Sequence, residues 1–296
     1  MTVPTELAVV VASVNGFPYL GACLESLRTH VPNAEIIVAD WTDDETRARV
    51  RAGWPDVTLL SFDEPKAVPE LRAAGIAAAT APYVAVIEDH CVVPPGWASA
   101  IVEAHEAGNH VVGGAVRNVK TSRARDWAPF FCEYSSFMEP SAAGVVGDLT
   151  GMNVSYDRDA LAEIADLLAE GRWENDLHAR LRARGFQLWA APGATIEHAK
   201  DFGFLEFASQ RYHYSRSFAG TRNKALGMRR WLYAIGSPLL FPLALWRIVR
   251  NVRARPGYGR AFRTAAPLVT VYSAIWAVGE LVGYTLGGGR SILKVR

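Results

Sequence analysis

The sequence predicts an α/β fold in which helices flank a mainly parallel β-sheet. In the first 120 residues, short apolar runs alternate with amphipathic stretches, which is typical of strands joined by crossover helices. The first run, residues 7–14, stops after eight residues, a length that suits a buried strand. With 296 residues, 50% of them hydrophobic and 21% charged, the composition is that of a globular protein and excludes a disordered, a collagen-like or a disulfide-rich small protein.

The elements of the first half follow from local patterning. Four apolar runs are predicted strands: residues 7–13, 35–40, 57–61 and 83–88. Between them, Leu20, Leu24 and Leu27 fall on one helical face. Residues 71–80 are predicted to form a helix of small residues that packs closely on the sheet.

The second half contains two further helices and a strand. Leu161, Ile164 and Leu168 have helical spacing, which predicts one helix there. A second helix is predicted over residues 174–185, where the final glycine marks a usual C-terminal stop. Residues 186–192 then have the pattern of a strand.

Charge is divided unevenly along the chain. The 31 Lys and Arg and 30 Asp and Glu residues give a formal net charge of +1. Residues 1–206, however, hold 16 basic and 29 acidic side chains, whereas residues 207–296 hold 15 basic side chains and one acidic one, Glu280. A split this sharp indicates two parts in different electrostatic surroundings. A basic tail attracts nucleic acid or the anionic face of a membrane, and its apolar content decides between them.

Two apolar segments, residues 231–246 and 265–289, lie within the basic tail. The second is long enough to span a bilayer, whereas Pro238 and Pro242 interrupt the first. In a transmembrane hairpin, the basic loop 247–263 would face away from the cytosol, against the positive-inside tendency. Interfacial or re-entrant helices are therefore preferred to a short hairpin, and a soluble helical subdomain is the alternative without lipid.

Cysteine usage and the N-terminus bear on the compartment. Cys23, Cys91 and Cys132 are too few and too irregularly spaced for a disulfide framework or a zinc module, which fits a reducing compartment. The N-terminus lacks the basic start of a signal peptide. We therefore expect the N-terminal part on the cytosolic side of the cytoplasmic membrane, with the basic tail on that membrane.

The strongest local feature is VAVIEDHCVVPPGW, residues 84–97, in which a buried-type strand runs into Glu88, Asp89 and His90. Open parallel sheets bind ligands at the carboxyl ends of their strands. Acidic and imidazole groups gathered there can hold a divalent cation, which can neutralise a diphosphate leaving group. A surface turn can carry the same three residues, so their spacing alone leaves a purely structural role open.

Five segments occur in order along the chain: residues 9–27, 36–46, 71–97, 150–161 and 173–185. Together they resemble the GT-A glycosyltransferases, specifically the large inverting family 2, over roughly residues 5–220. The resemblance implies a Rossmann-like GT-A domain in which Ser13 and Asn15 bind the donor and Asp40 contacts the nucleotide base. It also implies that Arg72 contacts the base or the diphosphate.

The same resemblance extends to the chemistry. Glu88, Asp89 and His90 take the place of the family's Asp-x-Asp motif, with Glu88 and Asp89 as donor-binding residues. Residues 150–161 resemble the segment that borders the donor sugar and acceptor, which implies a donor contact for Asn153.

The helix at 173–185 is similar to the family's Glu-Asp-x-Asp-Leu helix. The alignment puts Asp176 among the donor contacts and Glu174, in place of Asp, at the general-base position. A carboxylate at a helix start can take the proton of an acceptor hydroxyl as it attacks the anomeric carbon. The alternative is that both acidic residues only stabilise the positive end of the helix dipole.

Residues 210–217 lie where polysaccharide-synthase relatives carry Gln-x-x-Arg-Trp. His213 and Tyr214 replace the last two of these residues, which does not support processive polymer synthesis. Arg211 and Arg216 can still steady a diphosphate, and we assign Arg216 to donor binding. Attraction to a membrane explains these arginines equally well.

The metal site departs from the family pattern. His90 replaces the metal-binding final Asp, and a neutral imidazole favours Mn²⁺ over Mg²⁺ as the divalent cation. His198 follows a strand where family members often present a second ligand, so His90 and His198 are the candidate metal pair. The alternative is a protonated His90 that touches the diphosphate with no metal. Four further histidines have no partner pattern and are expected at the surface: His30, His105, His110 and His178.

These features predict a membrane-associated enzyme with a GT-A domain at residues 1–220 and a helical tail at 221–296. It would transfer a hexose from a nucleotide-sugar donor to an acceptor hydroxyl with inversion. The acceptor is expected to be a lipid or a lipid-linked molecule. The aromatic stretch 127–137 could line an apolar groove for such an acceptor, or it could pack in a core. No nucleic-acid partner is expected, because the apolar segments of the tail would serve no purpose in a nucleic-acid-binding protein. The alternative is a non-catalytic relative that binds a nucleotide or lipid.

Overall fold

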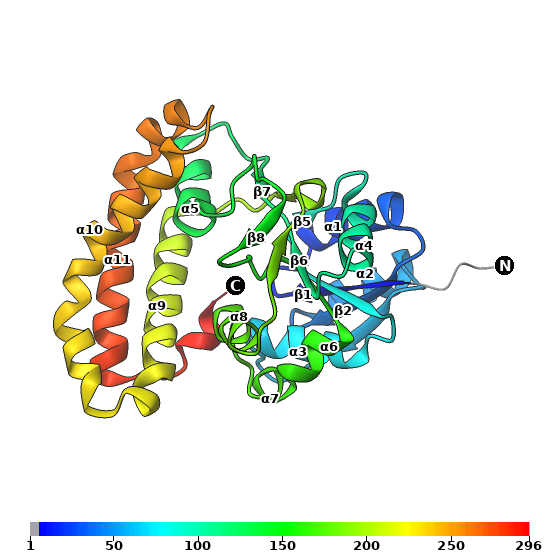
Figure 1. Cartoon of the computed structure of the whole chain (residues 1–296), viewed down its shortest axis with the longest axis horizontal. Helices are drawn as coiled ribbons and strands as arrows, with labels where there is room; N and C mark the ends of the chain where they lie inside the picture. The colour runs from blue at the N-terminus through cyan, green and yellow to red at the C-terminus, as the bar shows by residue number, and fades with distance from the viewer. Residues whose placement is uncertain (1–5, 296) are drawn as a thin grey trace. The chain divides into compact units, whose positions relative to one another are not determined.

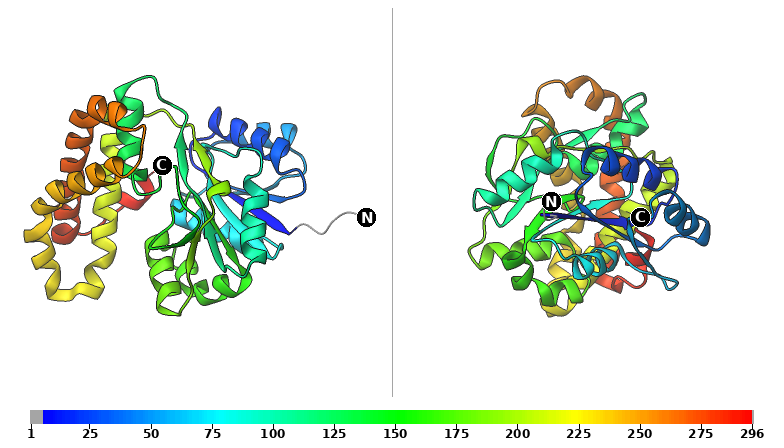
Figure 2. Two further views of the ribbon diagram at one scale, coloured as in Figure 1. Left: turned by 45° about the horizontal axis from the view of Figure 1, so that its top comes forward. Right: turned by 90° about the vertical axis from the view of Figure 1, so that its right-hand side faces the viewer.

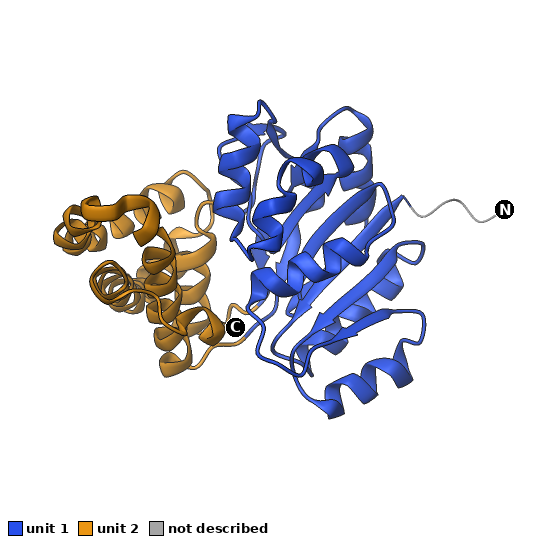
Figure 3. Ribbon diagram, turned by 90° about the horizontal axis from the view of Figure 1, so that it is seen from below, with its two compact units in different colours: residues 1–119, 137–200 blue, residues 120–136, 201–296 orange. Residues whose placement is uncertain are grey.

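The structure is a computed structural model that describes residues 6–295. The described chain forms two compact units (Figure 3). Unit 1 holds the described residues of Met1–Val119 together with Phe137–Lys200, and unit 2 holds Lys120–Ser136 together with the described residues of Asp201–Arg296. The predicted domain boundary at residue 220 rests on motif positions and stays a prediction. The chain ends included in the predicted domains, residues 1–5 and 296, lie outside the described residues.

Unit 1 is built on an eight-stranded mixed sheet (Figure 1). In spatial order its strands are β3 (Thr58–Ser61), β2 (Glu35–Asp40), β1 (Leu7–Ser13), β4 (Tyr83–Glu88), β9 (Asn153–Asp157), β6 (Val111–Gly113), β10 (Leu188–Ala190) and β8 (Gly144–Val146). The first four are parallel, as are β6 and β10, whereas β9 and β8 run antiparallel to their neighbours. The predicted α/β fold with a mainly parallel sheet is confirmed.

Helices cover both faces of this sheet. They are α1 (Tyr19–His30), α2 (Asp44–Gly53), α3 (Val68–Ala78), α4 (Trp97–Glu106), α6 (Arg158–Glu163), α7 (Ala165–Ala169) and α8 (Glu174–Ala183), with a 3₁₀ turn at Pro192–Ala194. Helices α3, α6, α7 and α8 lie on one face, and α1 and α4 lie on the other (Figures 1 and 2). The main core cluster joins strand residues such as Val10, Val86 and Val154 to Ile76 of α3 and Leu177 of α8.

The observed elements agree with the sequence where the pattern is local. The runs 7–13, 35–40 and 83–88 coincide with β1, β2 and β4. The single helix expected around Leu161 and Leu168 is wrong, because the chain breaks between α6 and α7 at Ile164. Ile164 leaves the helical conformation with φ −118° and ψ 9°, and its side chain is fully buried. The helix therefore breaks at a residue whose side chain is packed in the core.

A second, three-stranded sheet brings distant segments together. Its strands are β5 (Cys91–Val92), β11 (Ile196–His198) and β7 (Val116–Asn118). Antiparallel pairing of β5 with β11 sets Cys91 opposite His198. The residue before Cys91 is His90, so this small sheet is what places the two predicted metal ligands side by side.

Unit 2 is helical. It contains α5 (Ala124–Tyr134), α9 (Phe204–Leu226), α10 (Arg230–Arg253) and α11 (Gly259–Leu286), with 3₁₀ turns at Gly227–Arg229 and Ser291–Lys294. The aromatic stretch 127–137 forms most of α5, and the buried Phe131 ring packs against Tyr258 and Phe262. Packing in a core, rather than lining a groove, therefore accounts for these aromatic residues.

Close helix contacts in unit 2 depend on small residues. A Cβ atom on Gly279 would lie 1.9 Å from Ser215 Oγ, and one on Gly283 would lie 2.5 Å from the Arg216 carbonyl oxygen. The spacing Gly-x-x-x-Gly thus lets α11 approach α9 closely, as small residues do between membrane helices. Pro238 and Pro242 lie inside α10 without ending it, so the expected interruption of the first apolar segment is wrong.

Candidate active site

The carboxyl ends of β1, β2 and β4 bring predicted site residues to one edge of the large sheet. The parallel register pairs Ser13 with Asp40 and Ala12 with Glu88. Ser13 Oγ donates to Asp40 Oδ1 at 2.8 Å. The predicted donor-binding residues therefore gather where open α/β sheets bind ligands.

Asp40 is fully buried, and its carboxylate is already engaged by the protein. Thr42 Oγ1 donates to Asp40 Oδ1 at 2.8 Å, and Arg47 Nε donates to Asp40 Oδ2 at 3.2 Å. Arg47 also donates to the Phe62 carbonyl oxygen at 2.6 Å, which ties the loops after β2 and β3 together. Sequence reasoning missed Arg47, since an arginine on a helix is usually a surface charge. Asp40 therefore positions these loops.

Asp89 holds the loop that follows β1. Its Oδ2 atom accepts from the backbone N–H of Val14 at 2.9 Å and of Asn15 at 2.6 Å, and Asn15 Nδ2 donates to Oδ1 at 2.7 Å. Burial alone would raise the pKa of Asp89, but hydrogen bonds and charge from His90 and hydrogen bonds from Asn15 hold it below its ordinary value. The fully buried carboxylate fixes the half-buried Asn15, and a donor contact for Asp89 stays a prediction.

His90 and His198 lie together, as predicted. Their ring centroids are 4.9 Å apart with the planes at 79°, and both side chains are buried. Burial, followed by the nearby His90 and Lys200, lowers the pKa of His198 well below its ordinary value. His198 is therefore neutral at physiological pH, which is the form that binds metal ions.

Lys200 is a site residue that the sequence analysis did not single out. It is 4% exposed, and its Nζ atom donates to Asn15 Oδ1 at 2.7 Å. The signal for it was its position two residues after His198, on the chain that leaves β11.

Arg72 of α3 connects two acidic residues that are far apart in the chain. One of its terminal nitrogens pairs with Glu88 at the end of β4, and the other pairs with Glu174 at the start of α8. The guanidinium also lies 5.9 Å from the centre of the Trp173 ring, which packs in a cluster with Trp41 and Phe62. The predicted base and two predicted donor residues thus form one charged group at the sheet edge.

Gly151 makes room for this group. A Cβ atom at Gly151 would lie 2.2 Å from Glu174 Cδ and 2.6 Å from Arg72 Nη1. Such distances are far below van der Waals contact, so a side chain here would displace the carboxylate. The segment 150–161 therefore borders the candidate base, and its contact with the donor sugar and acceptor stays a prediction.

Asp176 and Asn153, two further predicted donor residues, lie apart from this charged group. The Asp176 side chain is 49% exposed and pairs with Arg172 at 3.4 Å, on a different face of α8 from Glu174. Asn153 is fully buried, with Nδ2 donating to the carbonyl oxygens of Ala115 and Ala194 and Oδ1 accepting from Trp97 Nε1. Asp176 therefore lies at the surface and Asn153 supports β9, and donor contacts for both stay predictions.

Arg216 belongs to unit 2. Its Nε atom donates to the Gly287 carbonyl oxygen at 3.0 Å, which ties α9 to the chain after α11. A donor contact for Arg216 stays a prediction.

A buried polar chain supports α8. Tyr156 OH lies 3.0 Å from His178 Nε2, and His178 Nδ1 lies 2.6 Å from Asp148 Oδ1. His178 follows Glu174 by one helical turn, so this chain anchors the face of α8 that carries the candidate base. His178 and His105 are buried, so their expected surface position is wrong. Each instead has a hydrogen-bonding partner on β9.

A small pocket lies beside this support. It has a cavity volume of only about 10 Å³ and is lined by Arg72, Tyr156 and Glu174 together with apolar side chains such as Ile76, Val86 and Leu177. The candidate base therefore lines a narrow pocket on the side of α3.

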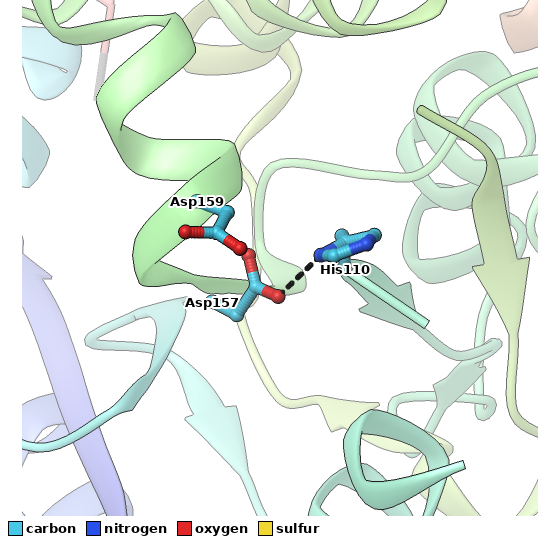
Figure 4. Close-up of side chains that lie close together, drawn as sticks. All are labelled: His110, Asp157 and Asp159. Carbon is cyan, nitrogen blue, oxygen red and sulfur yellow. Dashed lines mark hydrogen bonds and ion pairs between the residues drawn. The ribbon is translucent and has the colours of Figure 1, made fainter. Parts of the chain in front are cut away.

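A second group of possible ligands lies elsewhere in unit 1 (Figure 4). Among the described residues, His110, Asp157 and Asp159 offer donor atoms within 4.8 Å of one another. Asp157 Oδ1 caps α6 by accepting from Ala160 N–H at 2.9 Å, and His110 Nδ1 lies 2.6 Å from Asp157 Oδ2. A helix cap and the hydrogen bond between His110 and Asp157 explain the placement of these two residues without an ion.

Comparison with known proteins adds the family. The sequence model of the family described as glycosyl transferase family 2 matches residues 8–165, which is more than half of the chain. The chain belongs to glycosyltransferase family 2. It is therefore an enzyme that transfers a sugar from a nucleotide-sugar donor. No curated protein sequence matches this glycosyltransferase.

Two solved structures share its fold. A mannosyltransferase from Pyrobaculum calidifontis, solved with GDP-Man and Mn²⁺, is similar with 17% identity and a TM-score of 0.58, over 95% of this chain and 88% of that one. TarS from S. aureus is similar with 13% identity and a TM-score of 0.50, over 94% of this chain and 55% of that one. At these identities the likeness concerns the fold, and the GT-A-like architecture of this glycosyltransferase is shown.

Proposed function

We propose that this glycosyltransferase transfers a hexose with inversion and that Glu174 takes the proton of the acceptor hydroxyl. The observation that carries this proposal is the Arg72 bridge between Glu88 and Glu174. It holds a carboxylate beside the sheet edge where the donor-binding residues gather. The distant likeness to a mannosyltransferase supports a hexose as the transferred sugar.

In the proposed reaction, the acceptor oxygen attacks the anomeric carbon from the face opposite the nucleoside diphosphate. Glu174 accepts the hydroxyl proton as the new glycosidic bond forms, and the bond between the sugar and the diphosphate breaks. The electrons of the broken bond leave with the diphosphate. Arg72 provides a positive charge next to the diphosphate. Because this charge is already fixed in place, stabilising the developing negative charge costs no reorganisation during the reaction.

The donor-binding residues divide into two roles in this proposal. Asn15 and Glu88 are partly exposed and are proposed to contact the donor. Ser13, Asp40 and Asp89 are fully buried and are proposed to hold the loops that form its binding surface.

His90 and His198 are proposed to hold a divalent cation, with Mn²⁺ favoured over Mg²⁺. The neutral imidazole of His198 fits a metal ligand, and imidazole suits Mn²⁺ better than Mg²⁺. A cation held there would neutralise charge on the diphosphate leaving group. The Mn²⁺ in the mannosyltransferase of similar fold supports the same assignment. Equal transfer rates with Mn²⁺ and with a chelator would count against it.

Unit 2 is proposed to attach the enzyme to the cytosolic face of the cytoplasmic membrane. The described residues contain two helical segments, Phe204–Arg253 and Gly259–Leu286, that are long and apolar enough to cross a bilayer. The outer side of α10 is strongly apolar, with Leu232 71%, Ile235 79% and Leu239 72% exposed. These three residues are spaced by three and four, so they form one stripe along the helix.

The flanking charges favour helices that lie in the membrane surface. No charged residue occurs from Trp231 to Trp246, whereas Arg229 and Arg230 precede this stretch and Arg247 and Arg250 follow it. In a spanning arrangement, one of these arginine pairs would face away from the cytosol, against the positive-inside tendency. An in-plane α10 keeps both pairs at the anionic surface. An enzyme held there meets a lipid or lipid-linked acceptor, which is the acceptor that we propose.

The test combines binding, transfer and stereochemistry. Purified enzyme is incubated with UDP-, GDP- or dTDP-hexoses and with vesicles that carry a polyprenyl phosphate or a glycolipid. We expect one donor class to yield a glycosylated lipid whose anomeric configuration, measured by NMR, is inverted. Retained configuration would refute the proposed mechanism. Donor binding with neither transfer nor hydrolysis would favour the non-catalytic alternative.

A further inference from the structure

Arg211 of α9 carries a charge that the described residues do not pair. The residue is 7% exposed, and its Nε atom is enclosed without a hydrogen-bonding partner. Within residues 6–295, its guanidinium forms no hydrogen bond or ion pair through the two terminal nitrogens either. A buried charge without a partner is costly for a folded protein. Arg211 therefore calls for a partner that the described chain does not supply.

An aromatic ring on the neighbouring helix holds the Arg211 guanidinium in place. Helices α9 and α11 lie side by side in unit 2 (Figure 1). The guanidinium carbon lies 4.1 Å from the centre of the Trp276 ring, and Trp276 Nε1 donates to Glu280 Oε1 at 2.7 Å. The Tyr214 ring meets the Trp276 ring edge-on at 5.4 Å. Glu280 and Tyr214 thus fix the ring on which the guanidinium rests.

The edge of the Arg211 guanidinium is left free by this arrangement. An arginine that stacks on an aromatic ring keeps its N–H donors available in the plane of the guanidinium. Of the three nitrogens, only Nε is fully enclosed, so the two terminal nitrogens retain exposed surface. Such a planar fork matches two oxygens of one phosphate group. The geometry of Arg211 therefore fits a phosphate ligand.

Apolar surface beside Arg211 favours a phosphate that belongs to a lipid. Phe204 precedes Arg211 by seven residues, or two helical turns, so both lie on the same face of α9. Phe204 is 46% exposed, and the buried Phe207 ring lies 6.0 Å from the guanidinium carbon. A free phosphate ion has no apolar part that could cover Phe204. A phospholipid offers both a phosphate and an apolar body.

We propose that Arg211 binds the phosphate group of a membrane phospholipid. This inference rests on the proposed attachment of unit 2 to the membrane and deepens it. The exposed stripe of α10 supplies apolar contact area, and Arg211 adds a defined contact to one headgroup. Two phosphate oxygens accept from the terminal nitrogens of Arg211, and the negative charge of the phosphate offsets a positive charge that the fold leaves unpaired.

The experiment measures lipid binding in solution. Dihexanoylphosphatidylglycerol, kept below its micelle-forming concentration, is titrated calorimetrically into the full chain in a neutral detergent. Inorganic phosphate and dihexanoylglycerol are titrated in the same way, because the first lacks the apolar chains and the second lacks the phosphate. We expect the phospholipid to bind at least about tenfold more tightly than either of them, since a charge-assisted hydrogen bond alone contributes about that factor.

Three variants locate the site. Arg211→Met removes the charge and the fork and is expected to weaken phospholipid binding by about tenfold or more. Arg211→Lys keeps the charge without the planar fork and is expected to lose most of the affinity as well. Arg222→Met is the matched control on the same helix. The Arg222 guanidinium lies 5.1 Å from the Phe218 ring and donates to Tyr284 OH at 3.4 Å, so its removal should leave the affinity unchanged.

Cosedimentation with phosphatidylglycerol vesicles separates this inference from the proposed function. Arg211→Met should still bind vesicles through the α10 stripe. Vesicle binding by the unmodified enzyme, together with unchanged phospholipid affinity in Arg211→Met, would overturn the Arg211 site alone. Inorganic phosphate bound as tightly as the phospholipid would overturn the lipid as its ligand. An unmodified enzyme that does not bind vesicles would overturn the proposed attachment and this inference with it. If Arg211→Met does not fold, Arg211→Lys carries the same test.

Discussion

At the scale of single residues, the account depends on the charged group formed by Arg72, Glu88 and Glu174. These side chains come from α3, β4 and α8, and each is held by a different element. A change that moves the Glu174 carboxylate without removing it therefore tests whether its position matters for the reaction.

Gly151→Ala is that change. The new methyl group would lie 2.2 Å from Glu174 Cδ and 2.6 Å from Arg72 Nη1, so the contact between these two side chains must rearrange. We expect kcat for sugar transfer to fall by about tenfold or more, because small displacements of catalytic groups cost large factors in rate. Gly147→Ala is the control, since nothing lies within 4 Å of the added atom. Full activity in Gly151→Ala would show that the Arg72 bridge is not a catalytic arrangement.

Motif residues could be predicted from the sequence because short-range patterns place them. Ser13, Asp40 and Glu88 each end a recognisable apolar run, and parallel pairing brings such ends together. Lys200 and Arg47 could not be predicted. Their roles depend on partners that reach them through the fold, such as Asn15, 185 residues from Lys200 in the chain.

At the scale of elements, the sequence predicted strands better than it predicted helix packing. The strands β1, β2 and β4 are continuous apolar runs, and these are diagnostic for a buried parallel sheet. The position of α5 in unit 2 and the break at Ile164 depend on tertiary contacts. Helical periodicity shows which face of a helix is apolar, but it does not show which unit that face packs against.

Asn153→Ala tests whether this residue supports β9 or contacts the donor. Two buried carbonyl oxygens and the Trp97 N–H would lose their partner, at about 1–3 kcal/mol for each unsatisfied group. We expect the free energy of unfolding, measured with urea, to fall by about 2–5 kcal/mol. Donor affinity of the folded protein should be unchanged. Asn33→Ala, at an exposed position, is the control, and a selective loss of donor affinity would restore Asn153 to the donor site.

His105 links the end of α4 to β9 and predicts a pH dependence. Its Nδ1 lies 2.7 Å from the Asn109 carbonyl oxygen and its Nε2 lies 2.8 Å from Ser155 Oγ. Burial lowers the pKa of His105 from 6.5 to about 4. Between pH 6.5 and about 4, the His105 side chain is therefore protonated in the unfolded chain but neutral in the folded chain. Its contribution to the free energy of unfolding is fully present above pH 6.5 and is lost as the pH falls towards 4.

The measurement compares urea unfolding at pH 7 and pH 5. In the unmodified protein, His105 should contribute a fall of at most about 1.4 kcal/mol for each pH unit below 6.5. His105→Gln should lack this part of the pH dependence. Identical pH dependence in both proteins would mean that His105 is not held neutral by the fold.

At the scale of the whole molecule, the formal charge of +1 conceals an acidic part and a basic part. The acidic part carries the proposed site, and the basic part carries the apolar face of α10. This division was visible in the sequence, because it needs only charge and hydropathy. Which residues of α10 face outward could be learned only from the packing of unit 2.

Leu239→Glu tests membrane attachment. It places a charge in the exposed apolar stripe of α10, and burying a charged group in lipid is costly. We expect binding to anionic vesicles, measured by cosedimentation, to weaken by about tenfold or more. Val145→Glu, which alters an exposed apolar residue of unit 1, should bind like the unmodified enzyme. Equal loss in both variants would argue against the α10 face as the attachment surface.

The most direct test of the central claim is the transfer rate of Glu174→Gln. The glutamine oxygen can still accept from Arg72, so the variant removes the base and keeps the geometry. The account predicts a kcat about 100- to 10,000-fold below that of the unmodified enzyme. Donor affinity should be little changed, and Asp176→Asn should remain fully active. A Glu174→Gln enzyme that kept about a tenth or more of the original kcat would contradict the assignment of Glu174 as the general base.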